Sequence, residues 1–171
     1  FIVADATASP AADLTLSGAG AFRGSGLLTK AGAGTMILSN ANVHSGGTTV
    51  SEGTLLVNNT TGAGTGTGAV TVSAGATLGG TGIVSGALSV AGALAPGNSG
   101  IGTLTVNNTV SLSGTTALEL NKSGATLTSD RLQGVSTLTY GGTLAVTASG
   151  DALTAGNTFT LFSATTYAGS F

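Results

Sequence analysis

The sequence of 171 residues contains no cysteine and no tryptophan, and it is poor in charged, aromatic and proline residues. Without cysteine, the chain has no disulfide bonds and no thiolate metal ligands. Only 4 basic residues stand against 6 acidic ones. The basic residues are scattered rather than clustered, at Arg23, Lys30, Lys122 and Arg131. Because no positive patch results, we expect no nucleic acid and no anionic membrane surface as a partner.

Long apolar runs are also missing. No stretch approaches the roughly 18 apolar residues that a membrane-spanning helix needs, so we expect no direct membrane span in this chain. Hydrophobic residues nevertheless make up 41% of the sequence, which is enough for a folded core. Phe1 opens the chain without the pattern of a signal peptide, so we expect any export signal to lie outside it.

The residues that are abundant are small or hydroxylated: 30 Gly, 30 Thr and 18 Ser. They alternate with apolar residues in three-residue units, and strict alternation is the pattern of a strand with one buried face. The units are Leu14-Thr15-Leu16, Val70-Thr71-Val72, Leu88-Ser89-Val90, Leu104-Thr105-Val106, Val110-Ser111-Leu112, Leu118-Glu119-Leu120, Leu144-Ala145-Val146 and Phe159-Thr160-Leu161. Glycine pairs between the units, such as Gly46-Gly47, predict tight turns.

The strand units recur at a spacing that suits the coils of a solenoid. Their starts lie 14 to 22 residues apart, at Leu14, Met36, Leu55, Val70, Leu88, Leu104, Leu118, Leu138 and Phe159. This spacing predicts an all-β solenoid of about eight coils. A β-sandwich or jelly roll would also have short strands. Those folds predict hairpin turns every 8–12 residues and aromatic core anchors, whereas only 7 aromatic residues occur here.

Two segments, 28–59 and 68–108, carry a recognisable repeat. The first contains a Lys-x-Gly-x-Gly-Thr start, an Asn-x-x-x-Gly-Gly-Thr middle and a Gly-Thr-Leu close. Its matching residues are Lys30, Gly32, Gly34, Thr35, Asn42, Gly46, Gly47, Thr48, Gly53, Thr54 and Leu55. This pattern resembles the passenger-associated repeat of bacterial autotransporters, also called the autotransporter-associated β-strand repeat. Asn42-Val43-His44 stands where that family usually has Asn-Thr-Tyr, so one common aromatic residue is missing.

The resemblance implies a right-handed, single-stranded parallel β-helix in an exported or cell-surface protein. It implies a role in secretion, folding and structural display rather than in catalysis. Residues 118–171 resemble, more loosely, the C-terminal part of large repeat-bearing surface proteins. We therefore expect a partial cap and first strand at 1–20, passenger-repeat coils at 21–117, and C-terminal coils at 118–171 that continue in a parent protein.

Candidate catalytic residues are few and isolated in the sequence. A glycoside hydrolase needs two carboxylates at one cleft, and the acidic residues are Asp5, Asp13, Glu52, Glu119, Asp130 and Asp151. Glu119 lies 11 residues before Asp130, which does not match one coil. We interpret Glu119 as a solvent-facing strand residue and Asp130-Arg131 as a solvated turn pair. His44 is the only histidine, and we expect it to be exposed in the turn before Ser45-Gly46-Gly47.

Other motifs point away from cofactors. The run at 61–69 is rich in glycine but lacks the Gly-Lys-Ser/Thr ending of a phosphate loop, so a flexible corner is expected there. The calcium-binding repeat Gly-Gly-x-Gly-x-Asp does not occur. We therefore expect no enzyme activity, no catalytic or cofactor-binding residues, and no bound metal. A carbohydrate-active β-helix enzyme and an adhesin that binds a surface glycan or host ligand remain alternatives.

The ends of a solenoid expose unpaired strand edges, which proteins usually cover. Residues 1–10, with Asp5 and Pro10, are expected to cap the first coil in part. Apolar residues crowd the other end, at Phe159, Leu161, Phe162, Tyr167 and Phe171. We expect that end to be covered by other domains of the parent chain or by another subunit. In the second case the protein would be a fibre subunit that stacks head to tail.

Overall fold

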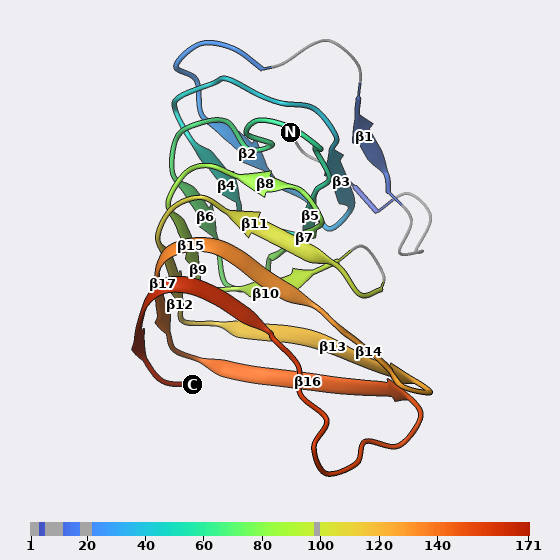
Figure 1. Ribbon diagram of the computed structural model, residues 1–171. Helices are drawn as coiled ribbons and strands as arrows, with labels where there is room; N and C mark the ends of the chain where they lie inside the picture. The colour runs from blue at the N-terminus through green and yellow to red at the C-terminus, as the bar shows by residue number, and fades with distance from the viewer. Residues whose placement is uncertain (1–3, 6–11, 18–21, 98–99) are drawn as a thin grey trace.

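The computed structural model describes residues 4–5, 12–17, 22–97 and 100–171. The regular elements within these ranges are all β-strands. Figure 1 shows the chain winding in successive coils from the N-terminus at the top to the C-terminus at the bottom. Strands of successive coils pair in parallel, so the expected all-β parallel β-helix is confirmed.

One face of the solenoid is a sheet built from one strand per coil. In stacking order its parallel strands are β1 (Leu14–Leu16), β3 (Thr35–Leu38), β5 (Thr54–Val57), β7 (Thr77–Gly80), β10 (Ala93–Pro96), β13 (Thr115–Ser123) and β16 (Thr143–Gly150). The short strand β14 (Thr126–Ser129) pairs with β13 in the antiparallel direction. We call this face sheet 1.

A second sheet covers the other faces. Its main path contains β2 (Leu28–Lys30), β4 (Thr48–Val50), β6 (Val70–Val72), β9 (Leu88–Val90), β12 (Val110–Leu112), β15 (Arg131–Tyr140) and β17 (Phe162–Gly169). Strands β8 (Ile83–Val84) and β11 (Thr103–Val106) form a third side. The long strand β15 joins both sides, because its first residues pair with β11 and its last residues pair with β12.

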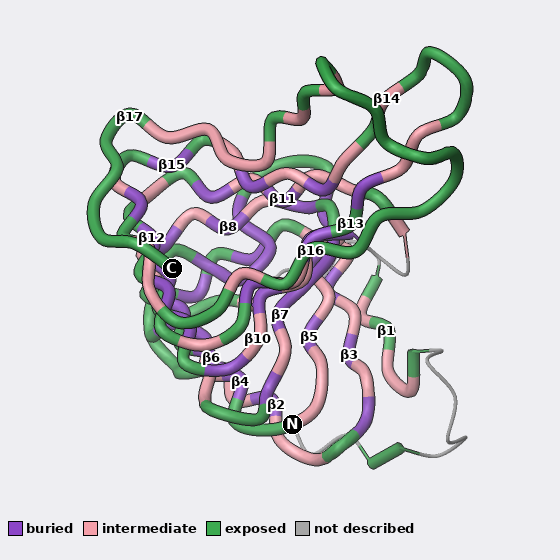
Figure 2. The backbone as a smooth tube through the Cα atoms, turned by 90° about the horizontal axis from the view of Figure 1, so that it is seen from below, coloured by how far each residue is buried: buried purple, intermediate pink, exposed green. Residues whose placement is uncertain are grey.

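The register places apolar residues in continuous files inside the coils. On sheet 1, Met36, Leu55, Leu78 and Leu94 stack on one another and are fully buried. The polar middle residues of the three-residue units point outward as expected: Thr71, Ser89, Ser111, Glu119 and Thr160 are exposed, and Thr105 is half-buried. In Figure 2 buried residues alternate with intermediate or exposed ones along the strands. The hydrophobic core is therefore a stack of side-chain layers rather than a cluster at one centre.

Coil length differs from the expected spacing. Register partners on β2, β4, β6, β9, β12, β15 and β17 lie 18 to 30 residues apart, and the last two coils exceed the expected 22. The chosen starts mixed different faces, since Leu104 lies on β11 and Leu118 on β13. The described residues supply seven strand levels on sheet 1, and the count of about eight coils is not confirmed. The hand of the coil also stays a prediction.

The glycine pair Gly46-Gly47 forms a tight turn, as expected. Gly47 has a φ of 90°, and a Cβ atom there would lie 2.5 Å from the Ala69 carbonyl oxygen of the next coil. A side chain at this position would be strained by the backbone conformation and would collide with the neighbouring coil. The turn thus lets two coils approach to the distance that strand pairing requires.

The last coil differs from those before it. Strands β13 and β16 extend past the coil as a projecting arm, which Figure 1 shows beside the hairpin to β14. Val146 pairs with the buried Leu118 but is 45% exposed, because β16 lies at the end of the stack. The expected strand unit at Phe159-Thr160-Leu161 is wrong, since β17 begins only at Phe162.

Aromatic residues gather on the final coils. The Tyr140 ring lies 5.3 Å from Phe162, 5.9 Å from Tyr167 and 4.8 Å from Phe171, measured between ring centroids. Tyr167 and Phe171 are nevertheless 47% and 40% exposed. What covers this end in a parent protein stays a prediction, as do the domain boundaries at 1–20, 21–117 and 118–171. Most of the expected N-terminal cap, including Pro10, lies outside the described residues.

The register predicts unequal losses of stability at two adjacent positions on β11. Leu104 is fully buried in an inner file, whereas Thr105 points outward. Leu104→Asp should lower the free energy of unfolding by several kcal/mol, about 3 or more, because an unpaired charge would be buried. Thr105→Asp should cost far less. Chemical denaturation of both variants measures this difference, and equal losses would contradict the register.

Candidate functional site

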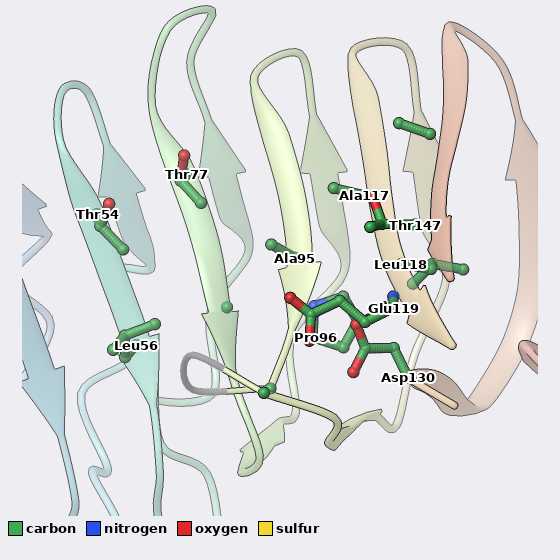
Figure 3. Close-up of a pocket in the computed structure, with 14 residues that line it drawn as sticks. Thr54, Leu56, Thr77, Ala95, Pro96, Ala117, Leu118, Glu119, Asp130 and Thr147 are labelled. Carbon is green, nitrogen blue, oxygen red and sulfur yellow. Dashed lines mark hydrogen bonds between the residues drawn. The ribbon is translucent and has the colours of Figure 1, made fainter. Parts of the chain in front are cut away.

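A groove of about 300 Å³ lies on the outer surface of sheet 1. Its floor is formed by outward-facing residues from successive coils: Leu56, Gly79, Ala95, Ala117 and Ala145. Figure 3 labels Leu56, Ala95 and Ala117 among them. Thr54 and Thr77 line one side. The other side consists of Pro96, Gly97, Gly100, Asp130, Glu119 and Thr147. Because four of the five floor residues carry at most one methyl group, the sheet is hollowed along the stacking axis.

Two carboxylic acids lie together at one side of the groove. The Asp130 backbone N–H donates to the Glu119 carbonyl oxygen at 2.8 Å, and the Glu119 N–H donates to Asp130 Oδ2 at 2.8 Å. The second carboxylate oxygen, Oδ1, accepts the Gly102 N–H at 2.8 Å. Figure 3 shows both acidic side chains next to Pro96.

The expectation that Asp130-Arg131 is a solvated turn pair is wrong for Asp130, which is only 1% exposed. The 11-residue separation from Glu119 is spanned by the β13–β14 hairpin rather than by a coil. The hairpin returns the chain to the same level, so the two residues become neighbours. Glu119 itself is exposed on β13, as expected.

Burial raises the pKa of Asp130 above the ordinary value of an aspartic acid. The hydrogen bonds from Gly102 and Glu119 oppose this shift without cancelling it. Within the described ranges, no Lys or Arg forms an ion pair with either acid. The groove therefore contains a buried carboxylate whose charge is not balanced by a protein cation.

His44 is buried, at 2% exposure, so the expectation of an exposed turn residue is wrong. Its Nε2 lies 3.2 Å from Thr48 Oγ1, and that hydroxyl donates to the Thr65 carbonyl oxygen at 2.8 Å. Since the hydroxyl hydrogen is used, Nε2 carries the proton of the imidazole and donates it. Nδ1 has no hydrogen-bond partner, and the ring packs against Gly66. His44 is thus part of a bonded chain that ends on Thr65 of the next coil.

Lys30 is fully buried at the start of the repeat. Its Nζ donates to the carbonyl oxygens of Gly32 at 2.6 Å and Glu52 at 2.9 Å, and more weakly to Ala31 at 3.3 Å. Gly32 and Glu52 belong to the corresponding turns of successive coils, so one ammonium group joins them. Burial lowers the pKa of Lys30, while the nearby carboxylates of Glu52 and Asp13 oppose this shift.

Asn42 provides a similar link at another corner. Its Oδ1 accepts the Phe22 N–H at 2.9 Å, and its Nδ2 donates to the Gly64 carbonyl oxygen at 2.5 Å. Phe22 and Gly64 lie about one coil before and after Asn42 in the sequence. The conspicuous polar residues of the repeat thus join coils to one another.

The remaining acids are separate from the groove. Asp13 accepts the Thr35 N–H and Asp151 accepts the Gly124 N–H, while Glu52 accepts the Gly32 N–H. Asp5 is exposed. In the part of the chain that the structure describes, no three His, Asp or Glu residues come close enough to hold a metal ion. No helix able to cross a membrane occurs there either.

The protein is a parallel β-solenoid, and one of its segments matches a known family. Residues 28–57 match the model of the family described as passenger-associated-transport-repeat. This matched segment comprises strands β2 to β5 and contains Lys30 and Asn42, and it is similar to a passenger-associated transport repeat. Such repeats are typical of extracellular or surface-exposed proteins. No curated protein and no solved structure matches the chain.

The groove was not predicted from the sequence. Four of its five floor residues are glycine or alanine, and their alignment becomes visible only when the coil register is known. A search for small residues at outward positions of successive coils could have found them. The pairing of Glu119 with Asp130 required knowledge of the β13–β14 hairpin.

Lys30→Met should lower the free energy of unfolding by about 1–3 kcal/mol, because buried carbonyl oxygens would lose their charged donor. Lys122→Met is a matched control, since Lys122 also donates to a backbone carbonyl, that of Ala152, but in an exposed arm. Thermal and urea denaturation should show a much smaller loss for this control. Equal losses would contradict the linking role of Lys30.

The second prediction concerns pH. The raised pKa of Asp130 means that its ionisation costs more in the folded than in the unfolded protein. The stability that protonated Asp130 contributes to the folded protein is complete below about pH 3.9, which is the pKa of an aspartic acid in an unfolded chain. This contribution declines as the pH rises through the pKa of Asp130 in the folded protein. Asp130→Asn removes this titration. The variant should therefore gain stability relative to the wild type as pH rises from about 3 to about 8. A constant difference, or a change of opposite sign, would disprove the assignment.

Proposed function

We propose that the chain is a non-catalytic structural module of an exported bacterial protein. In this proposal it forms part of a β-helical stalk or passenger, and its repeats aid folding after secretion. The supporting observation is that polar residues of the repeat form hydrogen bonds between successive coils. Lys30 and Asn42 are buried and donate or accept bonds across successive coils. A completed coil with these groups in place offers a template for the next coil.

The geometry of the two acids favours a structural role over glycoside hydrolysis. Glycosidases place two carboxyl groups on opposite sides of the bond that breaks. Here Glu119 and Asp130 are adjacent and share two hydrogen bonds: the Asp130 N–H donates to the Glu119 carbonyl oxygen, and the Glu119 N–H donates to Asp130 Oδ2. Both oxygens of Asp130 also accept backbone N–H groups. A carboxyl group engaged in this way is poorly placed to exchange protons with a substrate.

A second candidate function is a self-assembling extracellular fibre subunit. The favouring observation is the final coil, where β16 and β17 are each eight residues long and contain no charged residue. Exposed apolar side chains accompany these strands at Val146, Tyr167 and Phe171. Long uncharged strand edges favour pairing with another chain. Sedimentation velocity tests this candidate: polymers that grow with concentration support it, and a monomer at all concentrations contradicts it.

Export and display test the main proposal. The chain would be placed between an export signal and an autotransporter translocation domain, and the protease-resistant fraction at the cell surface would be measured. Lys30→Met should reduce that fraction by several-fold, because coils that are not linked fold less completely. Lys122→Met should leave it unchanged. Equal display and equal protease resistance for wild type and Lys30→Met would contradict a role of the repeat in folding after export.

A further inference from the structure

The groove on sheet 1 has a one-sided charge. Its described lining residues include two carboxylic acids and no Lys, Arg or His. Asp130 is buried at its side, and Glu119 is exposed at the same place. Removing a carboxylate from water without a compensating cation is unfavourable. A ligand that brings a positive charge to this point would therefore be favoured over a neutral or negative one.

The rest of the lining limits what kind of cation fits. The floor is largely aliphatic, from Leu56, Ala95, Ala117 and Ala145, and Pro96 adds an aliphatic ring on the side that carries the acids. A calcium ion needs six to eight oxygen ligands, whereas the described lining side chains supply only two carboxylates and threonine hydroxyls that are spread along the groove. The apolar floor would instead contact methylene groups, and a volume of about 300 Å³ is at the small end of ligand pockets.

Neutral saccharides fit less well. Aromatic side chains give sugar-binding and other small-molecule sites much of their contact energy, and no aromatic residue is among the described residues that line the groove. The hydroxyls of Thr54, Thr77 and Thr147 are spread along its length rather than converging on one point. A site for an alkyl ammonium group needs an acid for the charge and an apolar surface for the methylene groups. The groove has both, in the acids at one side and the methyl groups of its floor.

We propose that this groove binds a primary ammonium group carried on a short aliphatic chain, with the ammonium beside Glu119 and Asp130 and the methylene groups over Ala95 and Ala117. Two sources share this chemistry: a free diamine and the lysine side chain of another polypeptide. The proposal does not depend on the structural function proposed above, because it concerns the outer surface of sheet 1 and not the links between coils.

Nuclear magnetic resonance tests this site directly. The folded chain would be titrated with 1,5-diaminopentane, with N-acetyl-lysine N-methylamide and with the neutral 1,5-pentanediol. The amides of Gly102 and Glu119, which donate to Asp130, should shift with either amine and remain in place with the diol. Tighter binding of the diamine would identify a free diamine as the source, and tighter binding of the blocked lysine would identify a partner's side chain.

Three variants separate charge from shape. Glu119→Gln should weaken amine binding about fivefold or more by removing the exposed charge. Ala117→Leu should abolish binding by filling the floor, whereas Ala74→Leu, at an exposed turn residue outside the groove, should have no effect. If Ala117→Leu does not fold, the Glu119→Gln titration still decides.

Several results would overturn the proposal. Equal amide shifts with diol and amines would show that charge plays no part. Unchanged affinity in Glu119→Gln would show that the amine binds elsewhere. Shifts of Gly102 and Glu119 with calcium chloride but not with either amine would identify a metal site instead.

Discussion

Parallel pairing between successive coils determines which residue stacks on which throughout this molecule. Because each strand bonds to the strands one coil before and one coil after it, every inner position continues as a file along the axis. The same rule applies outside, where small residues at equivalent positions become a groove. Gly47 shows how strict the spacing is, since even a Cβ atom there would meet the neighbouring backbone.

The polar residues inside the solenoid follow from the same constraint. A corner leaves backbone carbonyl groups that no strand satisfies, and a buried carbonyl needs a donor. Lys30 supplies that donor to two successive turns, and Asn42 bonds to residues of two other coils. His44 and Thr48 form a further bonded chain that ends on Thr65. In the sequence His44 is a candidate catalytic residue, whereas in the structure these polar residues join coils.

The strand units and the solenoid could be predicted from the sequence because alternation has a period of two and requires no knowledge of distant contacts. The outward direction of Thr71, Ser89 and Ser111 follows from it. Which face a unit occupies could not be predicted, since Leu104 and Leu118 look alike in sequence but lie on different sheets. The burial of Asp130 could not be predicted either, because it depends on the neighbouring Glu119, 11 residues away in the sequence. The burial of His44 depends on packing against Gly66 of the next coil.

Distances between spin labels on the outer file of the second sheet test the solenoid most directly. This file contains Thr29, Thr49, Thr71, Ser89, Ser111, Thr139 and Ala168, each paired with the next. The chain has no native cysteine to interfere with labelling. Double electron–electron resonance on the cysteine pairs 49/139, 49/168 and 29/168 should give backbone separations near 19, 24 and 29 Å, about 4.8 Å for each added coil. Separations that do not increase by a constant step would contradict the parallel stack on which this account depends.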